Sequence, residues 1–160
     1  MYIINPFVYY NLEENNMKQT DFDLLTSVYQ NAEIAVQSIE NLLPMVRDDN
    51  LREELKRQRK GYLGFYKHCQ AVDTKKELKE NNFFEKSRLW LSIKMTTVFD
   101  KSTRHIAEMM LLGTVMGTLQ CYKDLSDHKK ANEDIINLTN ELLKLQERYF
   151  NRLKRFLRNV

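Results

Sequence analysis

The chain has 160 residues, of which 42% are hydrophobic and 29% are charged, and it contains only four glycines and two prolines. So few chain-breaking residues in a sequence of this length argue against an all-β or turn-rich fold and favour one domain built from long helices. The net charge of +3 is far below the concentrated positive charge of a dedicated nucleic-acid-binding protein, so we expect no nucleic-acid partner.

The cysteine content and the hydropathy of the chain exclude further classes of protein. Cys69 and Cys121 are too few and too far apart for a disulfide framework or a zinc knuckle, and both fall in apolar helical patterns, so we expect two buried, reduced thiols. No apolar run approaches the length of a membrane span, and the N-terminus lacks the basic region of a signal peptide. We therefore expect a cytoplasmic protein that has no membrane partner.

The N-terminal residues differ in pattern from the rest of the chain. Residues 1–19 show no helical periodicity, and we expect them to form an extension outside a domain of residues 20–160. Met17 directly follows the stretch Leu-Glu-Glu-Asn-Asn. Because adjacent glutamate codons can spell a purine-rich ribosome-binding sequence in a bacterial gene, a second hypothesis is that Met17 is the natural start.

The first long helix is expected to begin at Thr20. Thr20 followed by Asp23 is typical of a helix N-terminus, because side-chain oxygens there accept hydrogen bonds from free backbone N–H groups. Steps of three and four residues then place an apolar row on one face, made of Leu25, Val28, Ala32, Ala35, Ile39 and Leu42.

A second helix is expected after Pro44 and a short polar connection, with Asn50 and Glu53 as its capping pair. Its inner row reads Leu51, Leu55, Gln58, Tyr62, Phe65 or Tyr66, and Cys69. A connection this short makes the first two helices antiparallel neighbours.

A short helix and a third long helix are predicted next. Residues 83–99 read as a short helix that crosses from one helical hairpin to the other, and Ser102 is expected to cap the helix that follows. Residues 107–119 are almost wholly apolar, which predicts burial on most sides of this third long helix. Gly113 and Gly117 lie one turn apart within it and are expected to let a neighbouring backbone approach closely.

Asn132 is expected to cap a fourth long helix, with Glu133 and Asp134 in the first turn, where the helix dipole favours negative charge. Its apolar row is Ile135, Leu138, Leu142, Leu145, Tyr149, Leu153 and Phe156. Two helical hairpins joined by a crossover predict an all-α fold. We expect an antiparallel four-helix bundle, ferritin-like, with a short crossover helix between the second and third long helices.

The central part of the chain resembles a known family. Residues 88–94, Arg-Leu-Trp-Leu-Ser-Ile-Lys, are similar to the pattern Arg-x-Trp-x-x-aliphatic-Lys, which precedes the third bundle helix in an uncharacterised bacterial branch of the ferritin-like (rubrerythrin-like) superfamily. The following helix, with Gly113 at its centre and an aromatic residue near its end, occupies the matching place. The resemblance covers most of residues 20–156 as a pattern but only this central part residue by residue. It implies the ferritin-like bundle.

The chain departs from that family where metal would bind. Ferritin-like di-iron sites need a Glu from each of two helices and a Glu-x-x-His from each of the other two, and the chain contains no Glu-x-x-His. Around Gly113 this chain has apolar or neutral residues where the family branch often has acidic ones. We therefore expect no bound cofactor and no di-metal centre.

Five residues remain as candidates for a weaker metal site: Glu33, Glu40, His105, Glu108 and Glu141. Solvated flanking or capping roles are the preferred interpretation of Glu33, Glu40, His105 and Glu108, whereas Glu141 lies beside the apolar row of the fourth helix and could turn inward. Gln58 lies in the inner row of the second helix and is either a buried amide with a hydrogen-bonding partner or a vestigial ligand position.

The sequence shows no activated nucleophile and no glycine-rich phosphate loop, which favours a non-enzymatic protein. Two basic stripes are interpreted as solvated faces: Arg52, Lys56 and Arg59 on the second helix, and Arg148, Arg152 and Arg155 on the fourth. Exposed apolar patches commonly become interfaces. The crossover residues therefore predict a homodimer, because a short connector cannot easily bury all of Phe83, Phe84, Trp90 and Leu91.

The leading interpretation is thus a ferritin-like helical bundle that acts through self-association or through an unidentified protein partner. The alternative is a degenerate metal-binding oxidoreductase of the di-iron type that uses the five candidate residues.

Overall fold

The computed structural model describes residues 18–72, 82–96 and 99–158, and all regular secondary structure in these ranges is helical. The five α-helices are α1 (Gln19–Leu42), α2 (Asp49–Val72), α3 (Asn82–Thr96), α4 (Thr103–Asp127) and α5 (Glu133–Leu153). Short 3-10 helices continue α1 and α5, namely η1 (Leu43–Met45) and η2 (Lys154–Leu157). The predicted all-α class and the predicted short helix between the second and third long helices are confirmed.

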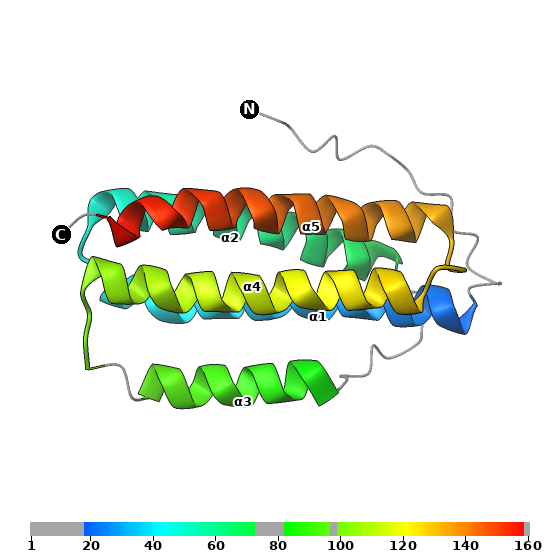
Figure 1. Ribbon diagram of the computed structural model, residues 1–160, viewed down its shortest axis with the longest axis horizontal. Coiled ribbons are helices and arrows are strands. Elements are labelled where there is room, and N and C mark those ends of the chain that lie inside the picture. The colour runs from blue at the N-terminus through cyan, green and yellow to red at the C-terminus, as the bar shows by residue number, and fades with distance from the viewer. Residues whose placement is uncertain (1–17, 73–81, 97–98, 159–160) are drawn as a thin grey trace.

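The four long helices lie side by side, and α3 runs along one flank (Figure 1). The α1 helix packs against α2, α4 and α5, and α5 also packs against α4 and α2. Short connections make α1 and α2, and likewise α4 and α5, run in opposite directions. The α2 and α4 helices run in the same direction, because α3 returns the chain along the length of the molecule before α4 begins.

The predicted inner rows form the core. Every predicted inner residue of α2 and α5 is buried, with Phe65 rather than Tyr66 in the fully buried position. In α1 the row is buried except for Ala35, which is half-buried because it lies at the edge that faces α3. Three- and four-residue spacing was therefore sufficient to identify the buried faces of these helices.

The N-terminus of α1 differs from the prediction. The helix begins one residue before Thr20, so Thr20 and Asp23 lie within its first turns and do not cap it. The Asp21 carboxylate instead accepts a hydrogen bond from the Lys18 backbone N–H at 3.4 Å and another from the Asn132 backbone N–H at 2.6 Å. Asp21 thus ties the start of α1 to the start of α5, a tertiary contact that local spacing does not reveal. Residues 1–17 of the expected extension lie outside the described residues.

The start of α2 also differs. Asp48 rather than Asn50 caps this helix, since Asp48 Oδ1 accepts a hydrogen bond from the Leu51 backbone N–H at 2.7 Å. The other two predicted caps are confirmed. The Ser102 hydroxyl and the Asn132 amide oxygen accept first-turn N–H groups of α4 and α5 at 3.2 and 2.8 Å.

The crossover helix α3 buries one of its aromatic residues. Phe84 is only 1% exposed, and Trp90 and Leu91 are half-buried, whereas the side chain of Phe83 lies outside the described residues. The expectation of an open aromatic patch on the crossover is therefore wrong at Phe84, because this side chain turns toward α1. Among the described side chains of α3, Leu89 is the large apolar one that is exposed, at 63%. The homodimer itself stays a prediction.

Both cysteines are buried free thiols, as predicted. Burial disfavours the charged thiolate and raises the pKa of Cys69 and of Cys121 to about 12. Within the ranges that the structure describes, no helix is both long and apolar enough to cross a membrane.

Candidate functional site

The outward side of α4 carries a row of apolar side chains that is open to solvent. Leu112, Val115, Leu119 and Tyr122 follow one another at steps of three and four residues, and they are 53%, 38%, 56% and 52% exposed. We call these four residues the α4 stripe. The prediction that this helix is buried on most sides is therefore wrong. Its apolar residues divide between an inward face and this outward one.

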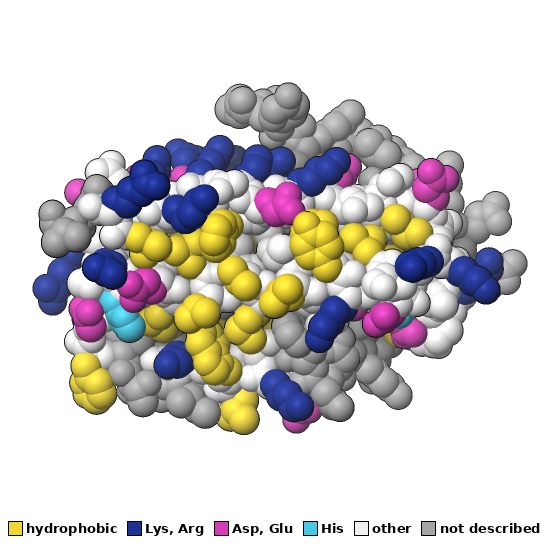
Figure 2. Space-filling model, viewed as in Figure 1, with side chains coloured by type: hydrophobic (Ala, Val, Ile, Leu, Met, Phe, Trp, Pro, Cys, Tyr) yellow, Lys and Arg dark blue, Asp and Glu magenta, His cyan; other side chains and the backbone are white. Residues whose placement is uncertain are grey.

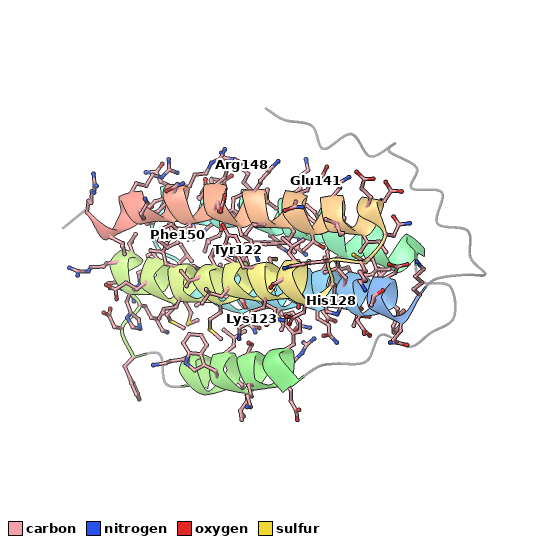
Figure 3. The ribbon with its side chains drawn as sticks, turned by 45° about the vertical axis from the view of Figure 1, so that its right-hand side comes forward. Tyr122, Lys123, His128, Glu141, Arg148 and Phe150 are labelled. Atoms are coloured by element: carbon pink, nitrogen blue, oxygen red, sulfur yellow. The ribbon has the colours of Figure 1, made fainter. Side chains whose placement is uncertain are left out.

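The α4 stripe lies in the middle of a broad apolar area. Figure 2 shows apolar side chains gathered over α4 and α5, with Lys and Arg side chains along the outer edge of α5. Tyr122 points toward α5 (Figure 3), and its hydroxyl donates a hydrogen bond to Glu147 Oε1 at 2.9 Å. Arg148 and Glu141 lie on the outer edge of α5, away from the stripe (Figure 3).

Charged side chains follow the α4 stripe at both ends. Glu108 lies four residues before Leu112, and Lys123 lies four residues after Leu119. Beyond them, Arg104 and Asp127 lie a further four residues out. Arg104 Nε donates to Glu108 Oε1 at 3.0 Å, and all four charged side chains are at least partly exposed.

The inward side of α4 contacts a buried polar network. Asn31 Nδ2, from α1, donates to the Gly117 carbonyl oxygen at 3.0 Å and lies 3.4 Å from Cys121 Sγ. Gln146 Nε2, from α5, donates to Asn31 Oδ1 at 2.7 Å, and Cys121 Sγ lies 3.6 Å from Gln146 Oε1. Asn31 and Gln146 are both buried. Three helices are thus joined in the interior by side-chain amides that satisfy one another.

Gly117 provides the space for this network. A Cβ atom at Gly117 would lie 2.5 Å from Gln146 Nε2 and 2.7 Å from Asn31 Oδ1, whereas a Cβ atom at Gly113 would meet nothing within 4 Å. The expectation that both glycines admit a neighbouring backbone is therefore wrong. Gly117 admits two side-chain amides, and Gly113 borders open space.

A second polar cluster joins α1 to the last turns of α4. The Ser27 hydroxyl donates to the buried Asp124 carboxylate, and Gln120 Nε2 donates to Asp124 Oδ1 at 2.7 Å. Burial raises the pKa of Asp124 above the usual range of a carboxyl, although the two hydrogen bonds and nearby His128 oppose this effect.

A pocket of about 60 Å³ opens between α1, α3 and α4, beside the Asn31 network. Much of its lining is apolar, with three methionines of α4 and Trp90 of α3, and its polar lining residues are Asn31, Ser38, Tyr62, Ser87, Thr114 and Gln146. None of the described residues that line it is Asp, Glu, Lys, Arg or His. The pocket is therefore uncharged and mostly apolar, with a small group of hydrogen-bonding side chains.

Two of the candidate metal ligands are held by arginines on the flank of α1. Glu33 pairs with Arg88 of α3, and Glu40 Oε1 accepts from Arg59 Nε of α2 at 2.8 Å. Both carboxylates are at least partly exposed. Ion pairs of this kind join neighbouring helices across the surface.

The other three candidates lie elsewhere. His105 Nδ1 and Glu108 Oε2 are 3.7 Å apart near the start of α4, where Arg104 shares the same glutamate. Glu141 is exposed on α5 and lies near His68 of α2. Burial lowers the pKa of His68, and the negative charge of Glu141 opposes this effect in part. In the described parts of the chain, no three His, Cys, Asp or Glu side chains come together as a group that could hold a metal ion.

The sequence interpretation passed over Glu54, a fully buried carboxylate on α2. Arg57 Nη1 lies 2.6 Å from Glu54 Oε2, and the guanidinium groups of Arg152 and Arg155 approach the carboxylate to 3.9 and 3.6 Å. The three arginines of this stripe are exposed, as expected for a solvated face, and Arg152 and Arg155 also approach the buried Glu54 carboxylate. Gln58 is buried as predicted, but its Nε2 donates to Glu54 Oε1 of the same helix at 3.0 Å, and its Oε1 has no hydrogen-bond partner among the described residues.

A positional signal for these buried polar residues was present in the sequence. Glu54 lies four residues before Gln58, an inner-row position. Asn31 and Gln146 also fall at three- or four-residue steps from buried members of their helices. Apolar periodicity alone does not identify these three residues, because none of them is apolar.

The chain was also compared with known proteins. No family model, no curated protein and no solved structure matches it.

Proposed function

We propose that this protein is a non-enzymatic, ferritin-like antiparallel four-helix bundle that works through self-association, with the α4 stripe of one copy packed against that of a second copy. The arrangement supports the bundle in one specific way. The α2 and α4 helices are parallel, and α3, which connects them in the chain, runs back along one flank, as a ferritin-like crossover requires.

The observation that carries the proposal is the exposure of the α4 stripe. A helix face in water is normally polar, and contiguous exposed apolar residues mark interaction surfaces. Their exposed fractions together equal about two fully exposed residues, which is roughly 120–240 Å² of apolar surface at about 1.5–3 kcal/mol per side chain and 25 cal/mol per Å².

The sequence of α4 makes this face complementary to itself. Three pairs of α4 residues are symmetric about the midpoint between Val115 and Met116. The pairs are Arg104 and Asp127, Glu108 and Lys123, and Leu112 and Leu119. A second copy related by a two-fold axis through this midpoint would run antiparallel. It would place its Lys123 against Glu108, its Asp127 against Arg104 and its Leu119 against Leu112. Self-complementarity of this kind is what a two-fold symmetric interface requires.

The size of the face sets the expected affinity. A standard interface buries about 800 Å² on each partner, and the stripe alone supplies less than half of that. We therefore expect a dissociation constant on the order of micromolar rather than nanomolar.

Analytical ultracentrifugation of the full chain across roughly 1–100 µM tests the proposal. Leu112→Glu should shift the protein to monomer. Leu89→Glu, a matched charge introduced at an exposed leucine of α3, should leave the dimer unchanged. A wild type that stays monomeric throughout this range, or a dimer equally weakened by both substitutions, would contradict it.

The charge pattern gives a second and sharper test. Lys123→Glu should weaken the dimer, because it places two like charges against each other across the axis. The double variant Glu108→Lys with Lys123→Glu should restore it, since the pairs are then exchanged. Failure of the double variant to recover affinity would refute the antiparallel register.

The metal-dependent alternative receives no such support. Its five residues are distributed over the flank of α1, the start of α4 and the outer edge of α5, and only His105 and Glu108 are neighbours.

A further inference from the structure

A second feature of the molecule is independent of self-association. The pocket between α1, α3 and α4 lies beside the Asn31 network and is bordered on one side by the α3 helix. Its volume of about 60 Å³ is several times the roughly 10–15 Å³ that one water molecule needs. We infer that this pocket is a binding site for a small neutral molecule with an apolar body and one hydrogen-bonding group.

The apolar walls determine most of this chemistry. Met109, Met110 and Met116 of α4 and Trp90 of α3 line the pocket. Methionine side chains are flexible and polarisable and adapt to ligands of irregular shape. An apolar wall with an aromatic ring is typical of sites for small organic molecules.

The polar side chains of the pocket determine which hydrogen-bonding group the ligand can carry. The Asn31 and Gln146 amides bond to each other, so most of their capacity is used within the protein. Thr114 Oγ1 donates to the Met110 carbonyl oxygen at 2.8 Å and keeps acceptor capacity, and Tyr62 interacts with both Thr114 and Gln146. One hydroxyl group or one uncharged N–H group on a ligand can therefore be satisfied here.

A charged ligand does not fit the same lining. The described lining residues include no side chain of opposite charge that would compensate a buried ion. Transfer of an uncompensated charge from water into such a site is strongly unfavourable. The site therefore selects neutral molecules over ions of the same size and shape.

Trp90 allows this selectivity to be measured directly, because it is the only tryptophan in the chain. The probe is 2,2,2-trichloroethanol, a neutral quencher of tryptophan fluorescence with an apolar body and one hydroxyl. Trichloroacetate is its anionic counterpart, and 1-hexanol is a competitor that does not quench. We expect quenching by trichloroethanol that saturates and is reversed by 1-hexanol, and only weak, linear quenching by trichloroacetate.

Variants locate the binding. Gly113→Leu adds a side chain at a pocket residue where a Cβ atom meets nothing within 4 Å, and Ala35→Leu narrows the pocket from α1. Gly64→Leu is the matched control, because a Cβ atom at this exposed position of α2 also meets nothing within 4 Å and Gly64 is not part of the lining. The saturable component should weaken at least tenfold in Gly113→Leu and Ala35→Leu and stay unchanged in Gly64→Leu.

Three outcomes would overturn the inference. Linear quenching by trichloroethanol in the wild type would show that no site is filled. Equal quenching by the neutral and anionic probes would remove the selectivity for neutral ligands. Saturable quenching that survives in both pocket variants would place the binding elsewhere. Each measurement is independent of the oligomeric state, since Leu112→Glu should leave the quenching unchanged.

Discussion

Substitution of Gly117 by alanine should destabilise the protein, whereas the same substitution at Gly113 should stabilise it. Both glycines lie within α4, one helical turn apart, so the change in helix propensity is the same for each. An alanine in place of glycine within a helix gains up to about 1 kcal/mol. The two sites differ in what the new methyl group would meet.

The expected magnitude follows from the contacts. At Gly117 the methyl carbon would lie 2.5 Å from Gln146 Nε2 and 2.7 Å from Asn31 Oδ1, atoms that are themselves hydrogen-bonded at 2.7 Å. Moving the amides apart leaves buried polar groups unsatisfied, at about 1–3 kcal/mol, and overpacking costs about 1–3 kcal/mol more. After the gain in propensity of about 1 kcal/mol, we expect Gly117→Ala to lower the free energy of unfolding by about 1–5 kcal/mol, with a midpoint near 3 kcal/mol. Gly113→Ala should raise it by about 0.5–1 kcal/mol.

Urea denaturation followed by circular dichroism at 222 nm measures both variants. For a chain of this length, a stability difference of about 3.5–4 kcal/mol between the two variants corresponds to roughly 7–16 °C in melting temperature. Equal m-values would show that the change lies in stability and not in the unfolded state. If Gly117→Ala proves as stable as Gly113→Ala, the assignment of the Asn31–Gln146 pair to the space beside Gly117 is refuted.

The remaining predictions concern buried ionisable groups. Because burial raises the pKa of Asp124 in the folded protein, this carboxyl contributes most to stability at low pH, and its contribution is lost as the pH rises through the raised pKa. As the pH rises from 4 to 7, the free energy of unfolding of Asp124→Asn should therefore increase relative to that of the wild type. If urea denaturation gives the same difference between the two proteins at both pH values, the raised pKa is contradicted. Glu54→Gln should lower the free energy of unfolding by about 1–2 kcal/mol, because it removes the charge from the bond with Arg57, and an unchanged urea midpoint would show that the bond contributes nothing. Cys69 and Cys121 should resist iodoacetamide at pH 8 in the native protein and react in urea, since burial raises both pKa values to about 12; rapid native labelling in mass spectrometry would show that the thiols are accessible.

Much of the interior followed from spacing alone. The rows through Leu55 and Leu142 were predicted because a helix repeats every 3.6 residues, so that apolar residues at steps of three and four must share a face. The caps at Ser102 and Asn132 were predicted because their bonds join residues that are near neighbours in sequence. These are local effects, and a single sequence carries them.

The candidate site could not be predicted from the sequence, because it depends on contacts between helices. The sequence of α4 is apolar on nearly all sides, so it does not show which apolar residues face inward. The partners of α4 decide this, because α1 and α5 cover one side and leave Leu112 and Leu119 exposed. Asn31 and Gln146 are 115 residues apart in the chain, and no local pattern pairs them.

The sequence by itself thus determined the class of fold, the order of the helices and the buried faces of α1, α2 and α5, because amphipathic periodicity is a property of each helix alone. Only the tertiary structure decided which side of α4 stays open, where Asp21 and Glu54 find their partners, and how Gly117 admits two amides. These features arise from the packing of one helix against another, and the physical reason they escaped prediction is that their energies depend on groups far apart in the chain.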